Sequence, residues 1–272
     1  MALSWTQDRL GPICRYAEDC AIVMQAVAKP DGRDMSVSDI PFNWNAQLDV
    51  KKLKVGIIKE SFEDITDATV KQHAERSLDT LREIGVSTFI PITVPEFTTS
   101  ASAINVESVV FFDEHARAGR MKEARNGGRP NGRLIPAVEY LRGQRVRMMM
   151  MQKLAEATAH VDVYVVAANP VGGGGGRGGG RGGDAAPDST PATTTAPTEP
   201  TRPQTPTQRH FAMANLACYP AINVPNGFLD SGSPTNVVFY ARPFGEMELL
   251  ALAKAYQDAA GFHLKHPTAL ET

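Results

Sequence analysis

Apolar residues recur along this chain with two spacings, and each spacing predicts one kind of secondary structure. Over residues 67–84 the apolar side chains return every three or four positions, which is typical of a helix with one buried face. Gly85 follows directly, and glycine is favoured just beyond a helix C-terminus. The same spacing predicts helices over 15–29, 100–117, 136–159, 210–217 and 246–260.

Short runs of almost only apolar residues predict strands that are covered on both faces. The runs LKVGII (53–58) and VDVYVVAA (161–168) have this character. Further strands are expected over 86–92, 221–228 and 236–243. A helix separates the strands 53–58 and 86–92, and this order is that of a crossover unit in an α/β sheet. The pattern therefore predicts an α/β fold.

The composition changes abruptly after the strand at 161–168. Residues 171–183 hold ten of the 23 glycines, and residues 184–206 are almost all Ala, Thr, Pro or charged. Neither stretch offers apolar side chains to bury, so we expect a disordered insertion, Gly-rich and then Thr/Pro-rich, over 171–206. The remaining ranges, 1–170 and 207–265, are expected to form one domain, followed by a tail at 266–272.

Two arginines in the glycine run, Arg177 and Arg181, resemble the arginine-glycine boxes of RNA-binding proteins. No aromatic residue lies between them, and acidic residues follow. An RNA-binding box remains an alternative to a flexible linker, but the sequence favours the linker. We expect no nucleic-acid partner.

The overall charge and hydropathy exclude several classes of protein. The formal net charge is −2, which gives no electrostatic basis for binding nucleic acid or an anionic membrane. No apolar run approaches the roughly 20 residues that span a bilayer, and the first ten residues do not resemble a signal peptide. We expect a soluble, cytoplasmic protein without a membrane partner. The three cysteines, Cys14, Cys20 and Cys218, are predicted to be buried thiols.

A search for catalytic and metal-binding motifs finds none of the common ones. The sequence has no HExxH, no GxSxG, no GxGxxG after a strand and no GxxxxGK[ST]. His263 and His266 are three residues apart, but no carboxylate or cysteine is near enough to complete a metal site. We expect no metal and no cofactor, and we predict that this pair lies in a solvated tail.

Several segments resemble the amidase signature family in sequence and in order. LSWTQDRLGPICRYAEDCAIVMQAVAKPDGRD (3–34) contains the family's D-x-x-G-P, its arginine, its E-D-x-A helix and its P-D-x-x-D turn. YPAINVPNGF (219–228) is similar to G-x-P-A-I-x-V-P-x-G-F, and ARPFGEMELLALAKAYQ (241–257) is similar to the closing helix. EYLRGQRVRMMM (139–150) looks like the family's Y-x-x-x-Q-x-x-R.

The chain also departs from the family pattern. Lys29 stands where the family usually has glycine, and SPTNVVFYA (233–241) lacks the glycines and glutamine of L-P-x-G-x-Q-x-x-G. The resemblance covers almost the whole chain except 171–206. It implies a mixed, twisted sheet flanked by helices, as in the serine hydrolases that include bacterial amidases and the A-type subunits of tRNA-dependent amidotransferases.

The resemblance also implies where the catalytic residues belong. The family uses a lysine, a bridging serine and a nucleophilic serine in a Gly/Ser-rich stretch. All three come before the segment that this chain matches, so the triad is expected upstream of Met1. We therefore expect the C-terminal half of an amide C–N hydrolase, which is inactive as this chain.

Tyr140 and Arg147, from the Y-x-x-x-Q-x-x-R motif, are the candidate substrate-binding residues. The alternative is that both residues pack and pair on a helix face. The expected partner is a small amide substrate in the full-length protein. A second hypothesis is a non-catalytic fragment that serves as a partner-binding module. In either case the missing half would leave a sheet edge and apolar faces exposed, so we expect association through that edge.

Overall fold

The computed structural model describes residues 4–35, 37–97, 102–123, 130–168 and 204–266. Most of the predicted insertion, 171–203, and the predicted tail from 267 onward lie outside the described residues. None of the helices in the described ranges has both the length and the apolar character needed to cross a bilayer.

Five strands form one mixed sheet in the order β2-β1-β3-β5-β4. β1 pairs in parallel with β2 and with β3, whereas β5 runs antiparallel to both β3 and β4. The strand bounds are β1 Val55–Ile57, β2 Phe89–Pro91, β3 Val163–Ala167, β4 Ala221–Phe228 and β5 Pro234–Ala241. The predicted α/β fold with a mixed sheet is confirmed.

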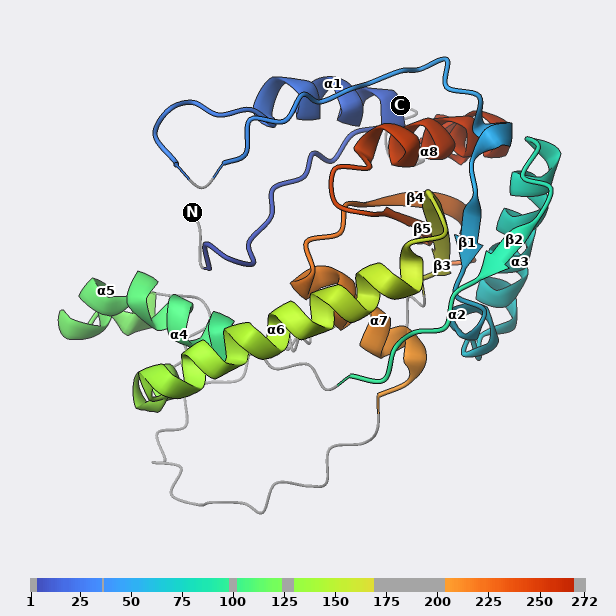
Figure 1. Cartoon of the computed structure of the whole chain (residues 1–272). Helices are drawn as coiled ribbons and strands as arrows, with labels where there is room; N and C mark the ends of the chain where they lie inside the picture. The colour runs from blue at the N-terminus through green and yellow to red at the C-terminus, as the bar shows by residue number, and fades with distance from the viewer. Residues whose placement is uncertain (1–3, 36, 98–101, 124–129, 169–203, 267–272) are drawn as a thin grey trace.

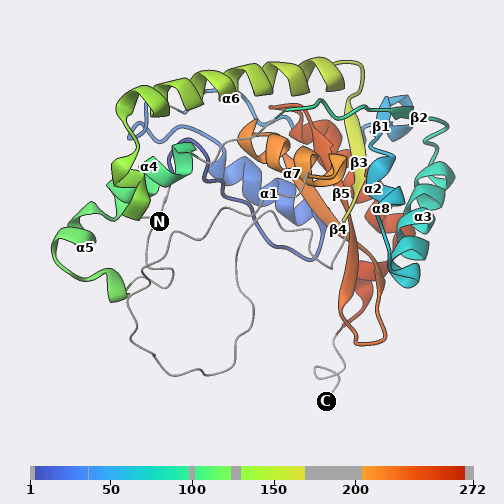
Figure 2. The same cartoon turned by 90° about the horizontal axis from the view of Figure 1, so that it is seen from below.

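Helices cover both faces of this sheet (Figures 1 and 2). Their bounds are α1 Ala17–Val27, α2 Glu60–Glu63, α3 Ala68–Glu83, α4 Ser102–Phe111, α5 Asp113–Arg117, α6 Ala137–Thr158, α7 Pro206–Leu216 and α8 Glu246–Ala260. The structure also has short 3₁₀ turns: η1 Val50–Lys52, η2 Met121–Glu123, η3 Pro130–Leu134 and η4 Phe262–Leu264.

Two of the helices differ from their prediction. The helix expected over 100–117 is two helices, α4 and α5, which meet at Phe112. α7 begins at Pro206, four residues before the predicted start, because Thr205 and Gln208 form a capping box. Gln208 N lies 3.3 Å from Thr205 Oγ1, and Thr205 N lies 3.2 Å from Gln208 Oε1. Thr205 and Pro206, predicted to end the insertion, therefore belong to α7.

The alternation of side chains in β3 divides the core into two layers. Val163 and Val165 point into one cluster with residues of α3 and α8, and Tyr164 and Val166 point into the other with residues of α6 and α7. All five β3 residues are buried, as expected of a strand covered on both faces. The long helix α6 adds Met150 to the second layer, whereas Met148 and Met149 are exposed. The successive methionines of α6 thus divide between core and surface.

Candidate functional site

A cavity of about 660 Å³ opens between the N-terminal segment, the C-terminal end of α7, the start of β4 and the first turns of α8. Its walls are mostly apolar, with Arg9, Cys20, Asn215 and Glu246 as polar groups. The apolar lining comes chiefly from Leu10, Pro12, Met24, Phe211, Ile222, Tyr240, Leu249 and Leu250. A concave, mostly apolar site with a few polar groups is the usual form of a small-molecule site.

The N-terminal segment, residues 4–12, reaches this cavity because α4 anchors its beginning. Glu107 on α4 is 1% exposed, and its carboxylate accepts hydrogen bonds from Ser4 Oγ, from Thr6 N at 3.3 Å and from Thr6 Oγ1 at 2.7 Å. A buried carboxylate is stable only where several donors surround it. Glu107 therefore fixes the position of Ser4 and Thr6, at the beginning of this segment.

The two predicted substrate-binding residues, Tyr140 and Arg147, lie on α6, behind this segment. Tyr140 Oη donates to Glu107 Oε1 at 3.0 Å. Burial, followed by this contact with Glu107, raises the pKa of the Tyr140 phenol. Arg147 donates from Nε to Leu216 O at 2.8 Å and from Nη2 to Thr6 O at 2.7 Å. Neither side chain lines this cavity, and the donors of both are directed to α4, α7 and the N-terminal segment.

Arg9 holds the next part of the segment against α7. Its Nη1 donates to Asn215 Oδ1 at 3.0 Å, and its Nη2 donates to the Asn215 carbonyl. The sequence motifs single out neither Arg9 nor Glu107. For Glu107 a signal exists, since it is the single charged residue in the helix SAINVESVVF. An acidic side chain on an otherwise apolar helix indicates a buried, satisfied carboxylate.

A cluster of buried aromatic residues packs behind Tyr240, a residue of the cavity wall. His210 on α7 is fully buried, and its Nε2 lies 2.9 Å from Tyr164 Oη. The His210 ring also meets the edge of Tyr240, which lines the cavity, with 4.9 Å between ring centroids. Burial lowers the pKa of His210 to about 3, so the imidazole is neutral near pH 7. This histidine packs as a neutral side chain against Tyr164 and Tyr240.

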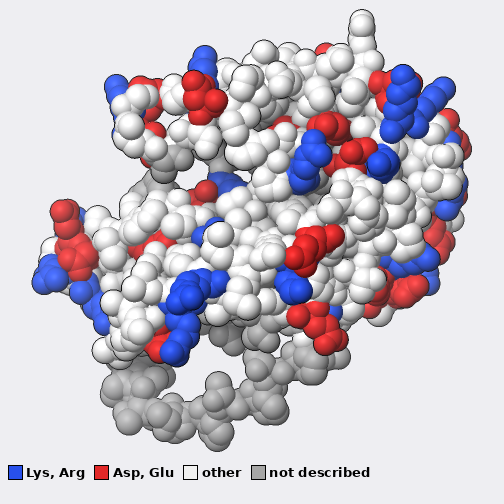
Figure 3. Space-filling view, in the orientation of Figure 1, with Lys and Arg blue, Asp and Glu red and all other residues white. Residues whose placement is uncertain are grey.

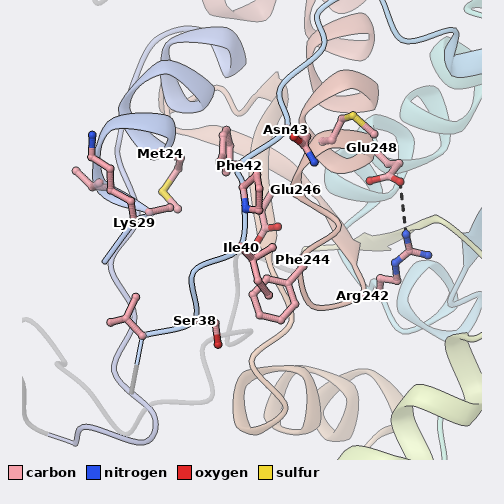
Figure 4. Close-up of a pocket in the computed structure, with 15 residues that line it drawn as sticks. Met24, Lys29, Ser38, Ile40, Phe42, Asn43, Arg242, Phe244, Glu246 and Glu248 are labelled. Carbon is pink, nitrogen blue, oxygen red and sulfur yellow. Dashed lines mark ion pairs between the residues drawn. The ribbon is translucent and has the colours of Figure 1, made fainter. Parts of the chain in front are cut away.

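A second cavity, of about 600 Å³, lies between α1, the loop 37–43 and the start of α8 (Figure 4). Met24, Ile40, Phe42 and Phe244 are arranged around the hollow. At its side, Arg242 Nη2 and Glu248 Oε1 form an ion pair at 3.6 Å. Additional lining residues are Val27, Lys29, Val37, Ser38, Asn43, Glu246 and Met247. Met24 and Glu246 line both cavities, so the two sites are neighbours.

The prediction of buried cysteines is wrong for all three thiols. Cys14 and Cys20 are half-buried and Cys218 is exposed. Among the described residues, few neighbours pack against the segment before α1 and against the sides of α1, where Cys14 and Cys20 lie. Cys218 lies in a turn with φ of 61°. Burial and the adjacent Cys14 raise the pKa of Cys20 to about 11, which disfavours its thiolate.

No three His, Cys, Asp or Glu side chains gather as a metal site requires within the ranges that the structure describes. His266 is exposed, as expected for a tail. His263 differs from its prediction, because it lies in η4, half-buried, with its ring 5.0 Å from the ring of Tyr16. On the face shown in Figure 3, acidic and basic side chains are mixed, and no extended area of one sign appears. Arg177 and Arg181 lie outside the described residues.

Comparison with known sequences shows the family of this chain. The amidase family model matches residues 1–173. The A-type subunit of glutamyl-tRNA(Gln) amidotransferase from Geobacter metallireducens is 27% identical over 285 residues, which cover 97% of this chain and 57% of that protein. An amidase of Pseudomonas putida is 28% identical over 279 residues, covering 98% of this chain and 56% of the relative. The chain spans little more than half the length of these relatives.

Solved structures share its fold. The crystal structure of the corresponding glutamyl-tRNA(Gln) amidotransferase protein from Thermotoga maritima has a TM-score of 0.63 and 19% identity, over 94% of this chain and 54% of that one. A bacterial aryl acylamidase of the amidase signature family has a TM-score of 0.65 and 15% identity, over 94% and 55%. Because the family model matches more than half of its residues and its fold is that of these enzymes, the chain belongs to the amidase family.

Proposed function

We propose that this chain is the C-terminal part of a hydrolase that cleaves carboxamide C–N bonds. The observation that carries the proposal is the match of the amidase family model to residues 1–173. The alignment covers 97% of this chain but only 57% of a curated relative, which supports a part of a longer protein. With the start of α7 as observed, the proposal takes 1–170 and 205–265 as one partial amidase domain, 171–204 as an insertion and 266–272 as a tail.

The cavity beside the N-terminal segment is the proposed wall of the substrate site. Its apolar surfaces, such as Phe211, Ile222 and Leu249, suit the non-reacting acyl or aryl part of a small amide. Holding that part in a fixed place is how an enzyme converts binding into orientation. This chain would then contribute half of the sheet and part of the pocket.

Tyr140 and Arg147 act in this proposal as positioning residues. Their donors are directed to Glu107 and to the carbonyls of Thr6 and Leu216. These bonds fix the segment that carries Arg9 and Leu10 into the cavity wall. A shift of that wall would move the substrate, which is the reason for expecting an effect of both residues on activity.

The nucleophile is assigned to the part of the fold that this chain does not contain. Four serine hydroxyls in the described ranges donate to structural partners: Ser4 to Glu107, Ser61 to Ile58 O, Ser77 to His73 O and Ser108 to Asn105 O. A serine nucleophile needs an adjacent base to be activated. We accordingly propose that the chain alone does not turn over amides.

A chimera tests this function. The N-terminal part of the Pseudomonas putida amidase, which has no counterpart in this chain under the proposal, would be fused to it. The assays would measure ammonia released from benzamide and 4-nitroaniline released from 4-nitroacetanilide. The chimera is expected to hydrolyse at least one of these amides, whereas the chain alone is expected to stay at the rate of buffer. A folded chimera without turnover of either amide, or hydrolysis by the chain alone, would contradict the proposal.

A further inference from the structure

The helix α1 leaves half of its apolar side chains exposed. Its sequence, AEDCAIVMQAV, is apolar around most of the helix, yet only Ala17 and Ala21 are buried. Ile22 is 58% exposed and Val27 is 49% exposed. A helix that is apolar on nearly all sides is normally covered on nearly all sides. This one is covered along a narrow strip against α8.

The exposed side of α1 has a fixed position in the fold. Gln257 on α8 accepts a hydrogen bond from Ala17 N at 2.8 Å and donates from Nε2 to Arg15 O at 3.0 Å. Both bonds hold the N-terminal end of α1, and Gln257 is itself buried. Because these bonds hold the N-terminal end of α1 against α8, the apolar side chains of α1 keep a fixed position in the fold.

Neighbouring segments extend this surface. Leu10 and Ile13 are exposed just before α1, and Ile40 and Phe244 are exposed across the second cavity (Figure 4). We define the α1 surface as Leu10, Ile13, Ile22, Val23, Val27, Ile40 and Phe244. Val27, Ile40 and Phe244 line one cavity together, so they belong to one hollow. Clustered exposed apolar residues around a hollow mark an interaction site.

One of the two edges of the sheet, that of β4, lies beside this surface. β4 ends the strand order, and among the described residues it pairs only with β5. The first two residues of β4, Ala221 and Ile222, line the same cavity as Leu10 of the α1 surface. An unpaired strand edge next to an apolar surface is suited to a partner that adds a strand and covers the helix.

We propose that the α1 surface and the free edge of β4 bind the N-terminal α/β part of an amidase-family polypeptide. This inference rests on the proposed function, because it takes this chain as the C-terminal part of the same fold. The argument for this occupant is the length of the relatives: 97–98% of this chain aligns with only 56–57% of their length, so they contain a further part of similar size. In those proteins the remaining polypeptide belongs to the same chain, and it is the natural cover for apolar surface that is exposed here.

The test mixes the purified chain with the separately expressed N-terminal part of the Pseudomonas putida amidase. Size-exclusion chromatography with light scattering would measure the complex. A one-to-one complex is expected. The double variant Val27→Glu/Phe244→Glu should weaken it by at least about tenfold, because charges would be buried at its centre. Met148→Glu, at an exposed methionine of α6, is the matched control and should bind like the unmodified chain.

The outcomes separate this inference from the proposed function. Absence of a complex with a folded chain would overturn the inference, and so would equal binding by the double variant. A homodimer of the chain that the double variant dissociates would show that a second copy occupies the surface, which also overturns it. Circular dichroism would verify that each variant is folded. A complex, together with an inactive chimera, would uphold the surface and contradict the amide hydrolase.

Discussion

Tyr140 on α6 donates a hydrogen bond to Glu107 on α4, with 3.0 Å between Tyr140 Oη and Glu107 Oε1. Thr6 Oγ1 donates to the same carboxylate oxygen at 2.7 Å. One buried carboxylate thus connects two helices and the N-terminal segment. That segment forms a wall of the larger cavity, so the position of the wall depends on a group that does not itself line the site.

Removing the Tyr140 hydroxyl should lower the free energy of unfolding. Tyr140→Phe takes one donor from a buried carboxylate, and a hydrogen bond to a charged group contributes about 1.5–3 kcal/mol. Urea unfolding measures the loss. Tyr16→Phe, at an exposed tyrosine, is the control and should change little. In a double-mutant cycle with Thr6→Val, the two losses should not add, because both donors share Glu107 Oε1. Strict additivity would show that the two bonds are independent.

Replacing Arg147 should loosen the N-terminal segment. Arg147→Lys keeps the charge but cannot reach Leu216 O and Thr6 O with one planar group. We expect faster amide hydrogen exchange over residues 5–12 and a loss of about 1–2 kcal/mol in unfolding free energy. Arg145→Lys, at an exposed arginine on the same helix, should leave both unchanged. Unaltered exchange in Arg147→Lys would mean that the segment is held by other contacts.

A side chain at Gly56 in β1 should be poorly tolerated. A Cβ atom there would lie 2.9 Å from Tyr164 Cβ and 3.1 Å from Val161 Cγ1, both closer than normal contact. Gly56→Ala should therefore cost about 1–3 kcal/mol through overpacking of the core. Thermal unfolding gives the measurement. Gly11→Ala, where nothing lies within 4 Å of the added atom, is the comparison. An unchanged melting temperature for Gly56→Ala would show that β1 and β3 can move apart freely.

The buried His210 should make the fold sensitive to acid. Its pKa is about 3 in the folded chain and about 6.5 when unfolded, so the unfolded state binds the extra proton first. Stability from this group is complete above pH 6.5 and is lost as the pH falls toward 3, by up to about 1.4 kcal/mol per pH unit.

His210→Gln tests this dependence, because glutamine does not titrate in that range. Urea unfolding between pH 6.5 and 4 should show a smaller decline with acid in the variant. The exposed His160 provides the control, since His160→Gln should keep the original slope. An identical slope in His210→Gln would assign the acid sensitivity to other groups.

Local sequence pattern predicts much of the fold because the elements themselves follow local rules. The continuous apolar run of β3 and the helical spacing of α3 each depend on residues within one segment, and both elements appear where expected. The family motifs are also contiguous, so the sequence alone indicates an amidase. The capping box that starts α7 at Pro206 was equally local, in Thr205 and Gln208, but it lay at the border of a low-complexity stretch.

The site depended on contacts that no local pattern contains. Ser4 and Glu107 are 103 residues apart, and Arg147 reaches Thr6 across 141. The strand order β2-β1-β3-β5-β4 likewise joins distant segments.

The sequence by itself thus determined the elements, the fold class and the family, because periodicity and short motifs act over a few residues. Only the tertiary structure decided which polar groups are buried and paired, and that α1 keeps its apolar side exposed. Burial is a property of what packs against a residue, and here those neighbours come from remote parts of the chain.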